Sequence, residues 1–280
     1  MQEEESRVHE TVKSVYPCET GEDNACTYVR STVEAELAKK SPSGHTGRLS
    51  SAVRAVVNQD KTIILACSSL TEYVEAAQER VGTRMQVRYL DRIYHRDPAE
   101  MQEHIKTELE RMPEGIDTVL VCMGFCGGSW HNVQSRCRLV IPRVDDCVSL
   151  LLQTKDEPVS NLKKPGHLYV RAKDPSTESF KAIFERMAKA YHVDDETAEQ
   201  KHKEWMALYN TISVMDTGIN QCRRDEYAAI VKQDADWLGA RMEYVEAGMH
   251  LLEKLFSGKW DYQFLVLEPG RAVRKEEMLI

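Results

Sequence analysis

Short apolar segments alternate with amphipathic segments from Lys61 onwards, and this alternation constrains the fold of the 280-residue chain more than any other feature. The segment at 118–123 is apolar along its whole length, as expected for a strand covered on both faces. Strands that alternate with helices are typical of βαβ units. The sequence therefore predicts an α/β fold with mainly parallel, Rossmann-like sheets flanked by helices. In the first half, strands are predicted at 62–67, 85–90, 118–123 and 139–142, and helices over 71–81 and from 97–98 onwards.

The alternation resumes after the polar loop at 155–166. The first 58 residues instead mix polar turns with one helical candidate, at 28–40, and show no alternation. We therefore predict an N-terminal extension (1–58), a first α/β lobe (59–162) and a second α/β lobe (163–280), with a cleft near 161–166. In the second half, strands are predicted at 167–172, 211–216, 242–245 and 263–267, and helices over 178–191, 196–209, 225–236 and 249–256.

Composition narrows the class of protein. Hydrophobic residues make up 42% of the chain and charged residues 29%, which is typical of soluble globular proteins. No apolar run approaches the roughly 18 residues of a membrane span, and the acidic N-terminus lacks the pattern of a secretory signal. The net charge of -8, without a stripe of Lys and Arg, argues against nucleic-acid binding. We expect a cytoplasmic protein with no membrane and no nucleic-acid partner.

Three of the eight cysteines follow predicted strands, namely Cys67, Cys126 and Cys147. Open α/β sheets bind their ligands at the carboxyl ends of the strands, so these thiols would converge if the strands are neighbours. Cytoplasmic cysteines seldom form disulfides, and thiolates prefer zinc or the iron of iron–sulfur clusters. The sequence predicts a three-thiolate metal site, holding either a [4Fe-4S] cluster with one open coordination position or zinc. The alternative is that the cysteines are core residues.

Other residues near these cysteines are candidates for the same site. His95 and His131 each follow a predicted strand, and either could supply a fourth ligand or a proton. Gly127 and Gly128 directly follow Cys126 and would let the backbone approach a bound group closely.

Cys147 begins an apolar, helix-like run, and the N-terminus of a helix would lower the pKa of its thiol. Asp145 and Asp146 would raise that pKa by repulsion, unless one caps the helix and the other pairs with Arg143. Asp145 and His95 are also our candidates for catalytic residues that transfer protons.

Several common functional motifs are missing. The sequence contains no G-x-G-x-x-G dinucleotide fingerprint, no phosphate loop and no D-x-H-x-x-G corrinoid signature. Serine-hydrolase G-x-S-x-G and metalloprotease H-E-x-x-H motifs are also missing, which argues against those classes.

Separated motifs together resemble the bacterial and archaeal family called domain of unknown function 1638, over about residues 62–270. They are Cys67 after the first strand, IYHRDP, GFCGG, IPRVDDCVSLLL and LLEKLFSGKWDYQFLVLEPG. The resemblance implies an α/β fold and a site around Cys67, Cys126 and Cys147, with Gly127, Gly128 and His95 nearby. Family members occur largely in anaerobes, often beside corrinoid-dependent one-carbon methyl-transfer systems. A corrinoid or methyltransferase protein is therefore an implied partner, besides a small-molecule ligand.

Three functions stay open from the sequence. The first is an iron–sulfur enzyme that acts on a small molecule in anaerobic one-carbon metabolism. The second is a three-cysteine zinc protein that acts in thiol or methyl transfer. The third is a non-catalytic accessory protein that holds a metal or cofactor for a methyltransferase system, so the sequence does not decide whether the protein is an enzyme.

Overall fold

The computed structural model describes two compact units of the chain. The first contains the described residues up to Lys163 and from Ala247 onwards, and the second contains those of Lys164–Glu246. The predicted helix at 28–40 lies outside the described residues, and only fragments of the helices predicted at 178–191 and 196–209 lie within them. The described residues are 55–171, 179–182, 184–185, 199–200, 203–204 and 206–278.

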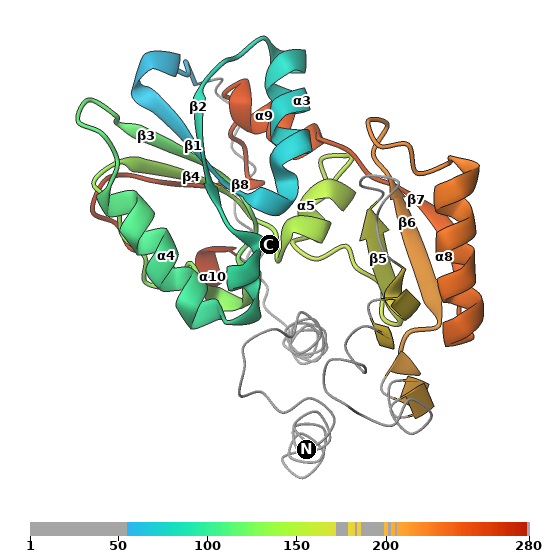
Figure 1. Cartoon of the computed structure of the whole chain (residues 1–280). Coiled ribbons are helices and arrows are strands. Elements are labelled where there is room, and N and C mark those ends of the chain that lie inside the picture. The colour runs from blue at the N-terminus through green and yellow to red at the C-terminus, as the bar shows by residue number, and fades with distance from the viewer. Residues whose placement is uncertain are drawn as a thin grey trace. The chain divides into compact units, whose positions relative to one another are not determined.

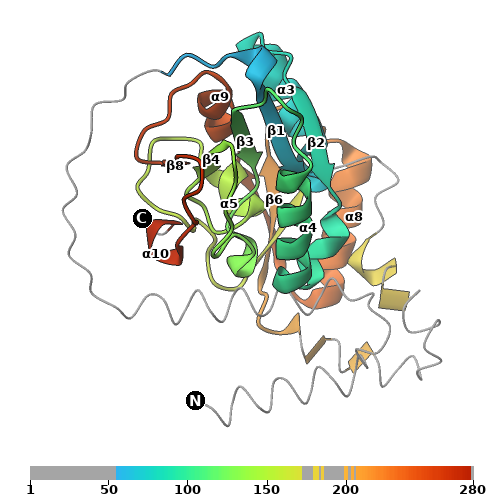
Figure 2. The same cartoon turned by 90° about the vertical axis from the view of Figure 1, so that its left-hand side faces the viewer.

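The first unit is built on a five-stranded sheet, which Figure 2 shows with its strands in the order β2-β1-β3-β4-β8. The first four strands are parallel, and β8 runs antiparallel to β4. Every residue of β1 and of β3 is buried, which explains why their sequences are apolar throughout. The chain runs from β1 outwards to β2 and then back across to β3, so the strand order reverses between β1 and β3. The bounds are β1 (Thr62–Cys67), β2 (Gln86–Leu90), β3 (Thr118–Cys122), β4 (Arg138–Pro142) and β8 (Phe264–Leu267).

Helices cover both faces of this sheet. Because βαβ crossovers are right-handed, the reversal at β1 places α3 and α4 on opposite faces. Figure 1 shows α4 across the sheet from α3 and α9. As predicted, Asp97 caps α4, since its carboxylate accepts a hydrogen bond from Ala99 N, and Pro98 is the first helical residue. The helices of this unit are α3 (Thr71–Val81), α4 (Pro98–Glu110), α5 (Cys147–Leu152), α9 (His250–Phe256) and α10 (Lys275–Met278).

Short 3-10 segments connect several of these elements. Two of them, η3 and η4, follow the carboxyl ends of β2 and β3. The segments are η1 (Gln59–Lys61), η2 (Ser68–Leu70), η3 (Arg92–Arg96) and η4 (Cys126–Gly128).

The second unit contains a three-stranded parallel sheet in the order β5-β6-β7. Its strands are β5 (His167–Arg171), β6 (Thr211–Asp216) and β7 (Arg241–Glu246), and α8 (Asp225–Leu238) follows β6. One face of the sheet packs its apolar side chains against α8 to form a core of Ile212, Val214, Cys222, Tyr227, Val231 and Ala235.

The predicted α/β class with mainly parallel sheets is confirmed, but the path of the C-terminal segment differs from the prediction. Residues 163–280 were assigned to one lobe, whereas the structure groups Ala247–Ile280 with the first sheet. The reason is that β8 pairs with β4, with Val266 opposite Val140. An apolar strand pattern does not indicate which sheet a strand joins. Among the described helices, none has the length and apolar character needed to cross a membrane.

Candidate metal centre

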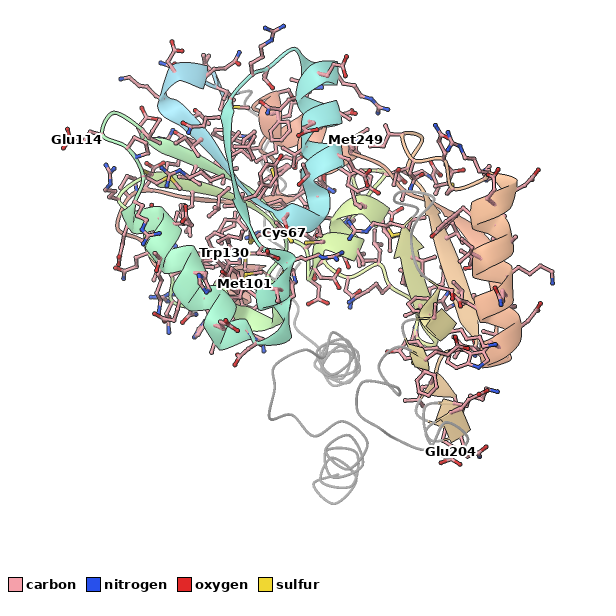
Figure 3. All side chains as sticks on the ribbon, in the orientation of Figure 1. Cys67, Met101, Glu114, Trp130, Glu204 and Met249 are labelled. Carbon is pink, nitrogen blue, oxygen red and sulfur yellow. The ribbon has the colours of Figure 1, made fainter. Side chains whose placement is uncertain are left out.

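Four donor side chains lie at the carboxyl ends of the four parallel strands of the first sheet. Cys67 is the last residue of β1, and His95 lies in η3 after β2. Cys126 begins η4 after β3, and Cys147 begins α5 after β4. Since β2, β1, β3 and β4 are consecutive neighbours, these turns meet at one edge of the sheet, where the strand order reverses and α/β folds bind ligands. Figure 3 shows Cys67 at this edge.

Three of the donors are close enough together to bind one metal ion. The donor atoms of Cys67, His95 and Cys147 all lie within 4.8 Å of one another. The Cys67 Sγ is 3.1 Å from His95 Nε2. Around a tetrahedral zinc ion with Zn–S bonds of about 2.3 Å, sulfur ligands stand about 3.8 Å apart. The two cysteines are buried and the histidine is half-buried, so the donor set suits a soft metal sheltered from water.

Cys126 adds a third sulfur beside this group. Its side chain forms a hydrogen bond with the thiol of Cys147 and interacts electrostatically with the His95 ring. The backbone φ of Cys126 is +47°, a conformation that is uncommon for residues other than glycine. Gly127 and Gly128 follow with φ of +68° and +99°, so the backbone turns sharply at these glycines. A positive φ in a cysteine has to be imposed by surrounding contacts.

Those contacts join the loop after β3 to the loop after β4. Phe125 N donates to Val144 O at 2.9 Å, and Cys126 N donates to Asp145 O at 2.7 Å. The loops approach so closely at Gly124 that a Cβ there would lie 2.5 Å from the Cα of Asp146. Glycine at this position therefore lets the two loops pair, which brings their cysteines together.

The Cys67 and His95 side chains form a thiolate–imidazolium pair. The pKa of Cys67 is lowered to about 4, chiefly because the Cys147 thiol donates a hydrogen bond to its sulfur, with a further contribution from His95. Burial lowers the pKa of His95, but electrostatic interaction with Cys126, the hydrogen bond and charge of Cys67, and the charge of Asp146 together outweigh burial and raise the pKa to about 9. The Ser69 Oγ, 3.0 Å from the Cys67 Sγ, also supports the thiolate.

The pKa of Cys147 is raised well above its ordinary value. The sequence left two opposite influences open, a helix N-terminus that lowers this pKa and two carboxylates that raise it, and neither is the main cause. Hydrogen bonds to Cys126 and Cys67 are the largest cause, followed by burial, and all of them favour the protonated thiol. The six-residue helix α5 does not overcome these local contacts.

The two carboxylates before Cys147 are balanced by a lysine that sequence reasoning missed. Of the two carboxylates that the sequence offers as a cap, Asp146 caps α5 and accepts a hydrogen bond from Ser149 N at 2.8 Å. Lys163 contacts Asp146 and lies 3.3 Å from the Asp145 Oδ2, whereas the Nη1 of Arg143, the expected partner, donates to Tyr262 O. Burial raises the pKa of Asp146, but Lys163 and the hydrogen bonds from Ser149 together outweigh burial and lower the pKa.

Lys163 had no signal in the sequence, because a charged loop residue reveals its partner only in the folded chain. Asp145, the candidate for proton transfer, is thus engaged in an ion pair.

His131 lies apart from the close group of donors. Its side chain is exposed, and its carbonyl accepts a hydrogen bond from Gln102 Nε2 at 2.7 Å. At Gly127 a side chain would be strained by the positive φ, and its Cβ would lie 3.0 Å from Pro98 Cγ, a tight contact.

The fold and the site define an α/β protein with a cysteine- and histidine-lined centre at the switch point of a parallel sheet. The chain belongs to the family described as Protein of unknown function (DUF1638), whose model matches residues 89–256. The match includes His95, Cys126 and Cys147, and Cys67 precedes it. Comparison with curated proteins found no match, and comparison with solved structures found none either.

Proposed function

We propose that this protein binds a single zinc-type ion through Cys67, His95 and Cys147, with Cys126 at a fourth, exchangeable position open to a small thiol. The observation that carries the proposal is the mutual approach of the first three donor atoms, all within 4.8 Å. Two thiolates, one imidazole and a further thiolate form a donor set typical of tetrahedral zinc.

The spacing favours one ion over an iron–sulfur cluster. Cysteines that hold a cubane bind different iron atoms, so their sulfurs stand further apart than ligands of a single ion. The tight group around the Cys67 Sγ, with His95 Nε2 at 3.1 Å, suits the smaller centre. A [4Fe-4S] cluster on Cys67, Cys126 and Cys147 is the alternative outcome of the experiment below.

The residues around the centre would have separate roles in thiol chemistry. A metal ion bound there would lower the pKa of a thiol coordinated to it. Cys126 is the donor best placed to yield its position, because its side chain is partly exposed and two glycines follow it. Lys163 would balance the carboxylates beside the centre. Such a site would suit an acceptor thiolate in methyl transfer, the reaction class implied by the family resemblance.

Metal analysis of the full chain, purified without oxygen, tests the proposal. The wild type is expected to contain one zinc ion per chain and to lack visible absorption. Cys67→Ser and Cys147→Ser are expected to lose the metal. Cys137→Ser is the matched control, because Cys137 is also buried but donates to Ile116 O away from the site. If the analysis finds iron and inorganic sulfide in place of zinc, then the site holds an iron–sulfur cluster. Equal metal content in the wild type and all variants would overturn the proposal.

Cobalt substitution tests the exchangeable position. Thiolate-to-cobalt charge-transfer bands report the sulfurs that are bound to the metal. Adding a small alkyl thiol to the cobalt form should change these bands in the wild type. An unchanged spectrum at saturating thiol would contradict an exchangeable position.

A further inference from the structure

The same group of sulfurs points to a modification site. We propose that small hydroperoxides oxidise Cys126, and that Cys147 then forms a disulfide with it, which releases the bound metal. The oxidation follows from the arrangement of the thiols alone, and only the metal release rests on the proposed function.

Solvent access selects Cys126 as the first sulfur to react. Among the six cysteines that the structure describes, five are buried and Cys126 alone is partly exposed. Cys67 is fully buried, and Cys147 is 7% exposed. Oxidation of cysteine follows exposure and thiolate character, so a peroxide arriving from water meets Cys126 before the other two.

Contact selects Cys147 as the partner. The thiols of Cys126 and Cys147 are hydrogen-bonded to each other, and the loops that carry them are joined by direct backbone hydrogen bonds. Disulfides need Cα atoms of roughly 4.4–6.8 Å separation, which adjoining backbone segments can supply with little movement. Gly127 and Gly128 allow the small adjustment at Cys126. The Cys67 sulfur also lies within 4.8 Å of the Cys147 sulfur and contacts His95 and Ser69, but Cys67 is fully buried, so peroxide does not reach it first.

The chemistry balances without a further reactant. The Cys126 sulfur attacks one peroxide oxygen, the O–O bond breaks, and a sulfenic acid forms while the thiol proton passes to the leaving oxygen, which departs as water or an alcohol. The Cys147 sulfur then attacks the Cys126 sulfur, the S–S bond forms, and the S–O bond breaks while the Cys147 thiol proton passes to the leaving hydroxide, which departs as water. Two electrons pass from the two sulfurs to the peroxide. Cys67 and His95 remain as donors, which are too few for the four ligands of a zinc site.

Peroxide titration of the full-length, zinc-loaded protein tests the proposal. After treatment with equimolar hydrogen peroxide, free thiols are alkylated, disulfide-linked peptides are identified by mass spectrometry, and released zinc is measured with a chromogenic chelator. The wild type should yield a peptide pair that links Cys126 to Cys147, with zinc released in step. The Cys126→Ser variant should lose the linked pair and release zinc more slowly. The control, Cys137→Ser, should behave like the wild type.

The remaining outcomes are decisive. Linkage of Cys126 to Cys18 or Cys26, linkage of Cys67 to Cys147 to the same extent in Cys126→Ser, or no linkage would overturn the proposal. The same peroxide titration of the reduced, metal-free protein distinguishes failure of the oxidation proposal from failure of the proposed zinc binding. If the Cys126–Cys147 link forms in a protein that binds no zinc, then the proposed function fails and the oxidation site stands. If zinc binds and the Cys126–Cys147 link does not form, then the oxidation proposal fails and the proposed function stands.

Discussion

At the scale of single residues, the donors of the candidate centre differ in protonation before any metal binds. Cys67, whose pKa is about 4, is a thiolate at neutral pH. His95, whose pKa is about 9, is a cation, and Cys147 is a thiol because its pKa is raised well above the ordinary value. Metal ligation requires a neutral imidazole and a thiolate, so protons have to leave His95 and Cys147.

Zinc affinity should therefore rise with pH between neutrality and about 9, the pKa of His95. The sign follows because the metal-free site holds protons that the metal-bound site does not, so higher pH favours binding. Calorimetric titration in buffers of different ionisation enthalpy measures the protons released. His95→Gln, which removes one titrating donor, should release fewer protons than the wild type. Equal zinc affinity across this pH range would contradict the prediction.

At the scale of secondary-structure elements, the site depends on the pairing of the loops after β3 and β4. Replacing Gly124 with Ala would place a Cβ 2.5 Å from the backbone of Asp146 and force the loops apart. Gly124→Ala is expected to lower the free energy of unfolding by about 1–3 kcal/mol, the usual cost of overpacking, and to weaken zinc binding. Gly248→Ala is the control, because Gly248 also lies in a loop, has no positive φ, and a Cβ there would approach only Thr154 Cγ2, at 4.0 Å. Thermal unfolding and zinc titration measure both effects, and a Gly124→Ala variant with wild-type affinity would contradict this account.

Elements with a strong local pattern could be predicted from the sequence. The apolar strand at Thr62–Cys67 and the helix at Thr71–Val81 are present with the predicted bounds, because periodicity and local composition determine them. The convergence of Cys67 and Cys147 could also be predicted, since it follows from parallel strand order. The partner of β8, the role of Lys163 and the raised pKa of Cys147 could not. They depend on contacts between residues far apart in the chain, which leave no local pattern.

At the scale of the whole molecule, the chain leaves the first unit after Lys163 and returns to it at Ala247. A buried lysine helps to fix the returning segment. The Lys254 Nζ donates to Asp156 Oδ1 at 2.6 Å, to Asp261 Oδ2 at 2.6 Å and to Gln263 Oε1 at 2.5 Å. Lys254 and Gln263 are buried, and Asp156 lies in the loop after α5. The contact with Asp156 joins the segment that contains α9 and β8 to the part of the chain that precedes the second unit, and the contacts with Asp261 and Gln263 connect α9 to the loop before β8.

Replacing Lys254 with Met should therefore destabilise the first unit. The substitution keeps much of the side-chain volume but leaves acceptors on the largely covered Asp261 and the buried Gln263 without their donor. Breaking a buried charge pair from one side costs about 3–5 kcal/mol. We expect the lower end of that range, because Asp156 can be hydrated once Lys254 is gone. Urea unfolding followed by circular dichroism measures the loss.

Lys232→Met is the matched control, because it removes an equally charged side chain from an exposed pair with Asp236. Exposed pairs within a helix contribute about 0.3–0.5 kcal/mol, so the control should unfold close to the wild type. Folded Lys254→Met should still bind zinc with wild-type stoichiometry, since the Lys254 ammonium group bonds to Asp156, Asp261 and Gln263, which are not metal donors. If Lys254→Met is no less stable than Lys232→Met, then the returning segment is held by β8 pairing and apolar packing alone, and the buried lysine does not stabilise it.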